Sequence, residues 1–129
     1  KPLKGKKAST YHHTQPPPND ANDWLVKEHY TRSNEPPDTF TCGGFAAAGA
    51  EEDAITKAGG TDTEKLIATM EGMEFMTPKG KMKFRKEDHQ ALQAMYAFQL
   101  DVKPDVEWAI PVLIKELSME ETAPPVMNK

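Results

Sequence analysis

The spacing of apolar residues predicts three helices in the first half of the chain. The first follows a cap at Asn19 or Asn22 and ends before a pair of prolines, because its apolar residues recur every three to four positions. The second spans about Gly44–Ala58 and is rich in alanine, and the two glycines after it suit a C-terminal cap. The third follows an N-cap at Asp62 and ends near Gly72.

The same pattern predicts strands on either side of these helices. A short strand within Lys7–Thr14 precedes three consecutive prolines, which enforce an extended linker. The residues Thr77–Gly80 have the chemistry of a turn, and around Met82–Phe84 apolar and charged residues alternate as in a one-sided strand. Two further strands are expected at Leu92–Leu100 and Val106–Leu117. The last contains a proline, which requires a sheet edge or a bulge, and a surface tail follows it.

The predicted order is one strand, three helices and three strands, which is typical of an α+β protein or of a piece of an α/β fold. The alanine-rich helix and the helix that contains Trp24 would normally cover a parallel sheet, yet no aliphatic strands precede them. The sequence therefore predicts that the sheet these helices need lies outside this chain. The sheet-facing sides of the Trp24 and Phe45 helices should then form a large apolar surface, exposed or covered by another chain.

Charge and composition exclude several classes of protein. The 129 residues include 16 basic and 20 acidic side chains, a formal charge of -4, so there is no cationic field to attract nucleic acid or an anionic membrane. The longest apolar run, Phe40–Ala50, is far shorter than the roughly 20 residues that cross a bilayer. The basic start, Lys1–Lys7, has no apolar core, so we do not expect a signal peptide there. Cys42 is the single cysteine, which precludes an intrachain disulfide.

Residue types that often carry chemistry are present without the spacing that the chemistry needs. His12 and His13 are adjacent and point to opposite faces of a strand, and no cysteine or carboxylate stands at ligand spacing around them or His29. The run Asp88–Gln90 lacks an accompanying nucleophile motif. Several methionines cluster near the junction of the third helix and the hairpin, with a spacing that favours core packing. We expect no metal, no cofactor and no catalysis.

A series of motifs, in order along most of the chain, resembles one protein family. The motifs are Gly5 in a strand, Tyr30–Arg32, Pro36–Phe40, Gly44–Ala47, Ala54–Gly59, Met76–Gly80, Phe84-Arg85 and Asp88–Gln90. Their order and spacing are similar to the C-terminal part of the type I periplasmic solute-binding proteins of ABC transporters. This group includes the leucine/isoleucine/valine-binding protein.

The resemblance implies a two-lobed α/β fold with a ligand cleft between the lobes, of which this chain would be the C-terminal third. Residues 1–18 would form a second-lobe strand and hinge crossing, residues 19–72 helices of the first lobe, and residues 73–129 the hairpin and C-terminal tail of the second lobe. The implied function is periplasmic capture of a small carboxylated solute for an ABC importer. The implied partners are the solute, the remainder of the receptor chain and the membrane permease. Branched-chain amino acids and aromatic acids are both compatible.

The resemblance also implies candidate ligand-binding residues. In the family, a residue just before the alanine-rich helix lies against the side chain of the ligand, and here the match falls on Phe40, which could instead anchor the core. Cys42 and Gly43 lie at the same helix entrance, where free N–H groups could face a carboxylate or form a simple turn. Phe45 stands where the family more often has tyrosine, so a hydroxyl contact would be lost.

Two other classes of function remain open at this stage. A stand-alone α+β module that binds a protein through its helix and hairpin surfaces would melt cooperatively and show no response to ligand. A ligand-sensing receptor domain would be followed by a transmembrane or effector segment.

Overall fold

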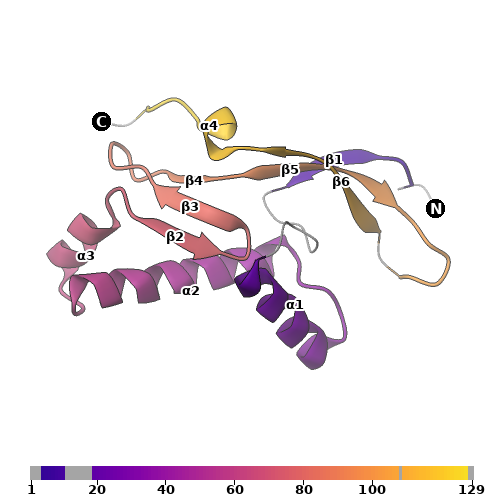
Figure 1. Cartoon of the computed structure of the whole chain (residues 1–129), viewed down its shortest axis with the longest axis horizontal. Helices are drawn as coiled ribbons and strands as arrows, with labels where there is room; N and C mark the ends of the chain where they lie inside the picture. Colours follow the sequence, from indigo (N-terminus) through magenta and orange to yellow (C-terminus); the bar gives the residue numbers. More distant parts are fainter. Residues whose placement is uncertain (1–3, 11–18, 108, 128–129) are drawn as a thin grey trace.

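The computed structural model describes residues 4–10, 19–107 and 109–127. In chain order its elements are β1 (Lys7–Thr10), α1 (Asp20–Ser33), α2 (Thr39–Ala58), α3 (Thr63–Met70), β2 (Glu74–Thr77), β3 (Gly80–Phe84), β4 (Ala91–Gln93), β5 (Met95–Asp101), β6 (Ile110–Leu117) and α4 (Met119–Thr122). The strands form two antiparallel sheets, β1-β5-β6 and β2-β3-β4. The long helix α2 runs along the β2–β3 hairpin, whereas the β1-β5-β6 sheet extends away from the helices (Figure 1). The expected mixture of helix and sheet is confirmed.

Short polar side chains begin α1 and α3 where the sequence predicts. The side chain of Asn19 accepts hydrogen bonds from the amides of Ala21 and Asn22, at 3.1 and 3.2 Å. The Asp62 carboxylate accepts one from the Lys65 amide at 3.1 Å. Each of these bonds satisfies a donor that the first helical turn leaves without a partner. The predicted cap at Asp62 is therefore confirmed, and of the two candidates for α1 the cap is Asn19.

The alanine-rich helix α2 begins at Thr39, not at Gly44 as predicted. The Asp38 carboxylate caps it by accepting from the amide and the hydroxyl of Thr41, at 2.7 and 2.8 Å. Adjacent glycines are poor helix formers, and they made the first turns look irregular, but the cap and tertiary packing outweigh that preference. The helix ends at Gly59, which has the left-handed conformation that the sequence predicts.

The strands are more numerous than predicted. The segment Glu74–Thr77 is an additional strand, β2, which pairs with β3 across the expected turn. The expected strand Leu92–Leu100 is two strands, β4 and β5, separated at Ala94 and belonging to different sheets. β6 starts at Ile110 and, among the described strands, pairs only with β5, so its proline lies in an edge strand as expected. Residues 11–14 of the first predicted strand lie outside the described residues, and the tail contains the short helix α4.

The core lies between α2 and the β2–β3 hairpin. Small residues from one face of the helix meet larger ones from the hairpin region, and the buried set is Ala46, Ala50, Ala54, Met73, Phe75 and Met82. The rings of Phe75 and Phe84 are 5.0 Å apart between centroids. The alanine face of α2 is thus covered within this chain, which corrects the expectation that its sheet lies elsewhere. The expected methionine core is found at Met73 and Met82, whereas Met76 is exposed.

This core includes residues on both sides of the boundary between residues 72 and 73 that the family resemblance implies. The helix α2 and the hairpin pack together as one unit, and the change from one sheet to the other comes at Ala94. The assignment of segments to the lobes of a longer receptor stays a prediction.

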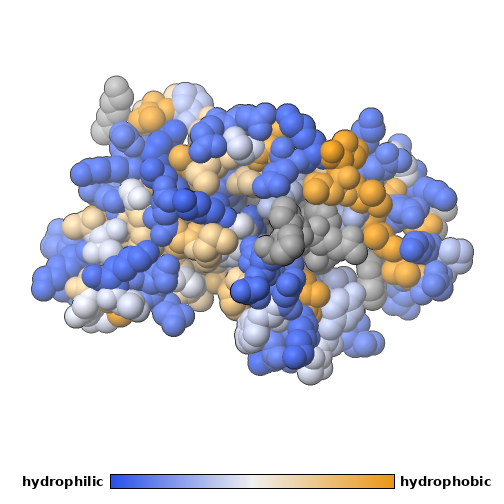
Figure 2. Space-filling view, in the orientation of Figure 1, coloured by the Kyte–Doolittle hydropathy of each residue, from blue (hydrophilic) through white to orange (hydrophobic). Residues whose placement is uncertain are grey.

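Large apolar side chains are exposed at several places among the described residues, including α1 and β6. On α1, Trp24 is 51% exposed even though its ring contacts that of Phe45, with centroids 5.6 Å apart. On β6, Val112, Leu113 and Ile114 are exposed. Figure 2 shows hydrophobic surface at the end of the molecule that holds the β1-β5-β6 sheet. The large apolar surface expected on the Trp24 and Phe45 helices is therefore found only in part, at Trp24, whereas β6 carries three consecutive exposed apolar side chains.

Candidate functional site

The exposed face of the first turns of α2 carries Phe40, the leading candidate. Its side chain is 82% exposed, which excludes the alternative of a core anchor within this chain. Gly44 and Ala47 lie four and seven residues further on, the spacing that places side chains on one helix face, and both are exposed. A Cβ added to Gly44 would meet no atom within 4 Å. An aromatic ring thus stands beside a flat surface of small residues.

Cys42 faces the opposite way and is fully buried. Its amide donates to the Asp38 carbonyl oxygen at 3.2 Å, the first bond of the helical ladder, so the amide of Gly43 also lies beyond the free N–H groups of the first turn. Burial raises the pKa of the Cys42 thiol to about 11, which keeps it protonated. The expectation that Cys42 and Gly43 offer free amides to a solute carboxylate is therefore wrong, because both lie inside the helix.

The helix entrance already holds a carboxylate of the protein itself. Hydrogen bonds from the Thr41 amide and hydroxyl lower the pKa of Asp38, so Asp38 is ionised at neutral pH. A solute carboxylate at the same position would be repelled by this charge. Phe45, the remaining candidate, is half-buried against Trp24 and joins α2 to α1. Of the four candidates, Phe40 has by far the most exposed side chain.

A buried polar cluster that sequence reasoning missed lies where α1, the β2–β3 turn and β5 meet. The Tyr96 hydroxyl donates to the backbone oxygen of Lys79 at 3.0 Å, and the Asn19 amide group donates to that of Thr77 at 2.8 Å. Thr77, Lys79 and Tyr96 are all buried. Burial lowers the pKa of Lys79 and raises that of Tyr96 to about 12. The residues Thr77–Gly80 indicated only a turn, and nothing local shows that β5 packs on it.

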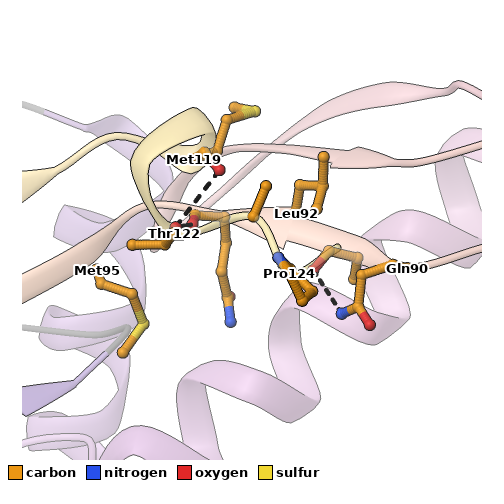
Figure 3. Close-up of a pocket in the computed structure, with 9 residues that line it drawn as sticks. Gln90, Leu92, Met95, Met119, Thr122 and Pro124 are labelled. Atoms are coloured by element: carbon orange, nitrogen blue, oxygen red, sulfur yellow. Dashed lines mark hydrogen bonds between the residues drawn. The ribbon is translucent and has the colours of Figure 1, made fainter. Parts of the chain in front are cut away.

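Two pockets lie away from Phe40. One, of about 270 Å³, is lined by Ile67, Met70, Glu71, Phe84 and His89, with the imidazole of His89 3.2 Å from a Glu71 carboxylate oxygen. The other, of about 140 Å³, lies beneath α4 (Figure 3).

Metal binding and membrane insertion gain no support from the described parts of the chain. No group of three histidine, cysteine or acidic side chains there could hold a metal ion, and His12 and His13 lie outside these parts. None of the described helices is long and apolar enough to span a bilayer.

Comparison with known proteins identifies relatives that extend beyond this chain. A family model described as periplasmic binding protein matches residues 2–105. The crystal structure of an ABC-type branched-chain amino acid transporter from Rhodopseudomonas palustris CGA009 has 57% sequence identity and a TM-score of 0.91, over 98% of this chain and 34% of that one. An ABC transporter structure from Rhodopseudomonas palustris has 64% identity and a TM-score of 0.60, over 74% of this chain and 29% of that one.

A more distant structure shows the same fold. The closed form of a leucine-, isoleucine-, valine-, threonine- and alanine-binding protein from Brucella ovis is 17% identical, with a TM-score of 0.79 over 96% of this chain and 34% of that one. No curated protein matches the sequence.

The chain spans about a third of the length of these solved relatives. The family and these relatives are solute-binding proteins of ABC transporters, which are not enzymes. The chain belongs to the periplasmic binding protein family and matches the C-terminal part of a type I member, as its motifs indicated.

Proposed function

We propose that this chain is part of the substrate-binding component of an ABC importer, which captures a small carboxylated solute between two lobes in the periplasm. The observation that carries this proposal is the family match over residues 2–105, together with 57% identity to a structure named as a branched-chain amino acid transporter. The remainder of the receptor chain would supply the other wall of the cleft, and the membrane permease would receive the solute.

We infer the class of solute from what the relatives are named for. One relative was solved with 3,4-dihydroxybenzoic acid and another with p-hydroxybenzoic acid, and the Brucella protein is named for five amino acids. Almost all of these compounds combine a carboxylate with an apolar body. A flat exposed face beside an aromatic ring suits the apolar body, so an amino acid or an aromatic acid is the proposed solute.

Phe40 is the proposed contact to the apolar part of the solute. The absence of side chains at Gly43 and Gly44 would let the solute approach the helix closely. Phe45 would act from behind by holding α1 against α2, and Cys42 would fill the space beneath. Because Asp38 is ionised, the carboxylate of the solute would point away from this helix entrance, toward donors from the rest of the receptor.

A thermal-shift screen of the full-length receptor tests the proposal. The screen tests leucine, p-hydroxybenzoate and 3,4-dihydroxybenzoate. Leucinamide is the control for leucine, and p-cresol is the control for the two benzoates; both controls keep the apolar body and lack the carboxylate. Binding to the folded form raises the melting temperature. We expect a saturable rise with at least one acid and none with its control. A receptor that responds equally to an acid and its control contradicts the proposed solute class, and one that responds to none of these acids contradicts the proposal as stated.

A further inference from the structure

The strands β4 and β5 belong to different sheets and are connected by a single residue. β4 ends at Gln93 and pairs with β3, whereas β5 begins at Met95 and pairs with β1 and β6. Only Ala94 separates them. Rotation about a few backbone bonds at such a position can change the angle between the two sheets. The angle is therefore determined by whatever contacts span this joint.

The short helix α4 spans the joint. Its start is attached to the β1-β5-β6 sheet, because it follows β6 directly and the last residue of β6, Leu117, pairs with Met95. A capping box fixes this start, in which the Ser118 amide and hydroxyl are bonded to Glu121 at 2.8 and 3.2 Å. Its end is attached to the β2-β3-β4 sheet, because the Thr122 hydroxyl donates to the carbonyl oxygen of Gln93 in β4, at 3.0 Å.

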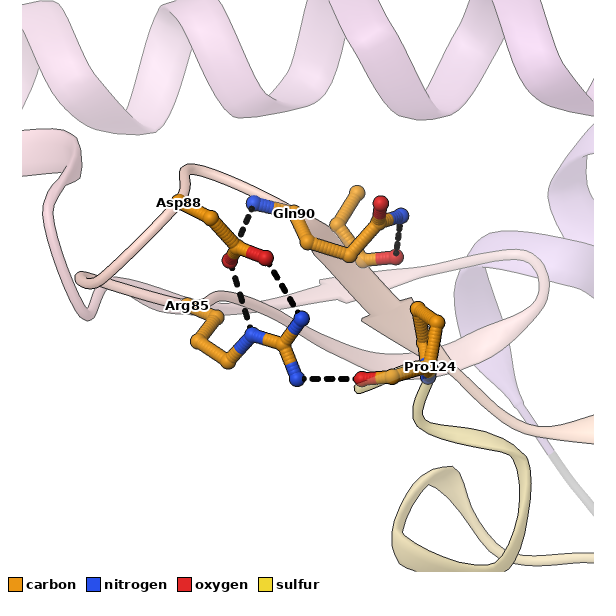
Figure 4. Close-up of polar contacts among 5 residues, drawn as sticks. Arg85, Asp88, Gln90 and Pro124 are labelled. Atoms are coloured by element: carbon orange, nitrogen blue, oxygen red, sulfur yellow. Dashed lines mark hydrogen bonds and ion pairs between the residues drawn. The ribbon is translucent and has the colours of Figure 1, made fainter. Parts of the chain in front are cut away.

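Arg85 makes a second attachment just beyond α4. Its guanidinium donates to both carboxylate oxygens of Asp88, at 2.7 and 2.6 Å, and also to the carbonyl oxygen of Pro124, at 2.7 Å (Figure 4). The two side chains are only 14% and 9% exposed. The bidentate pair orients the guanidinium, so that its remaining edge faces the chain after α4. The hydrogen bonds from Arg85 also lower the pKa of Asp88.

Hydrogen bonds, and not close apolar packing, hold α4 in its position. The pocket of about 140 Å³ lies beneath it, between Met95, Met119 and Pro124 among others (Figure 3). The side-chain oxygen of Gln93, which also lines this pocket, is buried and has no hydrogen-bond partner among the described residues. A segment that rests on a cavity and is held by a few hydrogen bonds can be released at small cost, unlike one held by a filled core.

We propose that residues 118–124 form a strap that sets the angle between the two sheets, and that Arg85 is the positioning residue that holds the strap in place. The Tyr96–Lys79 bond ties the sheets together at a second point, so releasing the strap loosens the joint without separating them. The consequence for solute binding rests on the proposed function. In a receptor whose lobes close on a solute, a change of this angle shifts the populations of the open and closed forms.

Distance measurements on the solute-free, full-length receptor test the strap. Spin labels at Glu52 on α2 and Asp105 in the loop between β5 and β6 report the angle between the two sheets. Two variants each remove a different attachment of the strap. Arg85→Met removes the hydrogen bond to the Pro124 carbonyl oxygen, and Thr122→Val removes the one to the Gln93 carbonyl oxygen. We expect both to broaden or shift the distance distribution and to raise amide exchange in residues 118–124. The increase should be about tenfold or more for Arg85→Met, since a hydrogen bond to a charged group contributes about 1.5–3 kcal/mol, and smaller for Thr122→Val, which removes a bond between neutral groups. Arg85→Lys should restore the distribution only in part.

Controls separate the strap from general loss of structure and from the proposed function. Arg32→Met makes the same chemical change at an exposed ion pair with Glu28 and should leave the distances unchanged. Distributions for Thr122→Val and for folded Arg85→Met that match the unsubstituted receptor overturn the strap, whatever the solute affinity. Titration with leucine and p-hydroxybenzoate is read separately, because altered distances in a receptor that binds neither acid support the strap while contradicting the proposed solute class.

Discussion

The unit formed by α2 and the β2–β3 hairpin and the β1-β5-β6 sheet are stabilised in different ways. The first has a closed apolar core in which the alanines of α2 meet Phe75 and Met82. The second leaves the apolar side chains of β6 exposed and is joined to the first by hydrogen bonds at Tyr96, Thr122 and Arg85. The difference indicates that a closed apolar core stabilises the first unit, whereas the second buries Tyr96 and Phe98, leaves β6 exposed and is joined to the first in part by hydrogen bonds.

Truncation of Phe75 should have the largest effect on stability. Its side chain is 5% exposed and packs on Phe84, so Phe75→Ala leaves a cavity in the core and should lower the free energy of unfolding by about 3–5 kcal/mol. The matched control is Phe40→Ala, where the same atoms are removed from an exposed site and the expected change is within about 0.5 kcal/mol. Urea unfolding of the full-length receptor measures both. Equal losses would show that the two phenylalanines have the same structural role.

The effect of Phe40→Ala should instead appear in solute affinity. If Phe40 contacts the apolar part of the solute, its loss removes about 1.5–3 kcal/mol of apolar burial, which corresponds to an increase in Kd of about tenfold or more. Met127→Ala, at a large apolar side chain that is 80% exposed, is the control and should leave the affinity nearly unchanged. Calorimetric titration with the acid found in the screen measures the effect. If Phe40→Ala lowers the melting temperature as much as the affinity, Phe40 has a structural role and is not a specific solute contact.

Loss of the hydrogen bond from Tyr96, which links the two units, should have an intermediate effect on stability. Tyr96→Phe removes the hydroxyl that donates to the Lys79 carbonyl oxygen and leaves that buried oxygen without this donor, which should lower the free energy of unfolding by about 1–3 kcal/mol. Tyr30→Phe, which changes an exposed tyrosine on α1, is the control and should have a much smaller effect. Urea unfolding again provides the measurement. An unchanged midpoint for Tyr96→Phe would mean that the two units are not coupled through this bond.

How far the sequence predicts these features depends on whether their determinants are local. Caps at Asn19 and Asp62 and the left-handed Gly59 are decided by neighbouring residues. The sequence predicts the last two and limits the first to Asn19 or Asn22. The division of one expected strand at Ala94 depends on which distant strands pair with each half, and no local pattern encodes such pairing. The family motifs, spread over most of the chain, identified the fold even where single elements were misplaced.

The candidate site was predicted less well than the fold because the start of α2 was misplaced. Once the helix begins at Thr39, Cys42 shares a spacing of four with Ala46 and Ala50, so all three lie on the buried face, and Phe40 falls outside it. That periodicity is visible in the sequence. The two glycines obscured it, since they favour a loop in isolation. The contact between the β2–β3 turn and Tyr96 has no comparable signal.

The smallest expected effect concerns the cap of α2, which stabilises the core unit through exposed hydrogen bonds. Asp38→Ala removes the acceptor of the Thr41 amide and should lower the free energy of unfolding by about 1 kcal/mol at neutral pH. Hydrogen bonding lowers the pKa of Asp38 from its ordinary value of 3.8, so this stabilisation is present above that value and is lost as the pH falls through the lower pKa of the folded state. Urea unfolding of the full-length receptor at pH 7 and at decreasing pH measures the difference from the unsubstituted protein. Asp38→Asn keeps a cap that does not titrate, and a difference for Asp38→Ala that stayed constant below pH 3.8 would exclude an ionised cap.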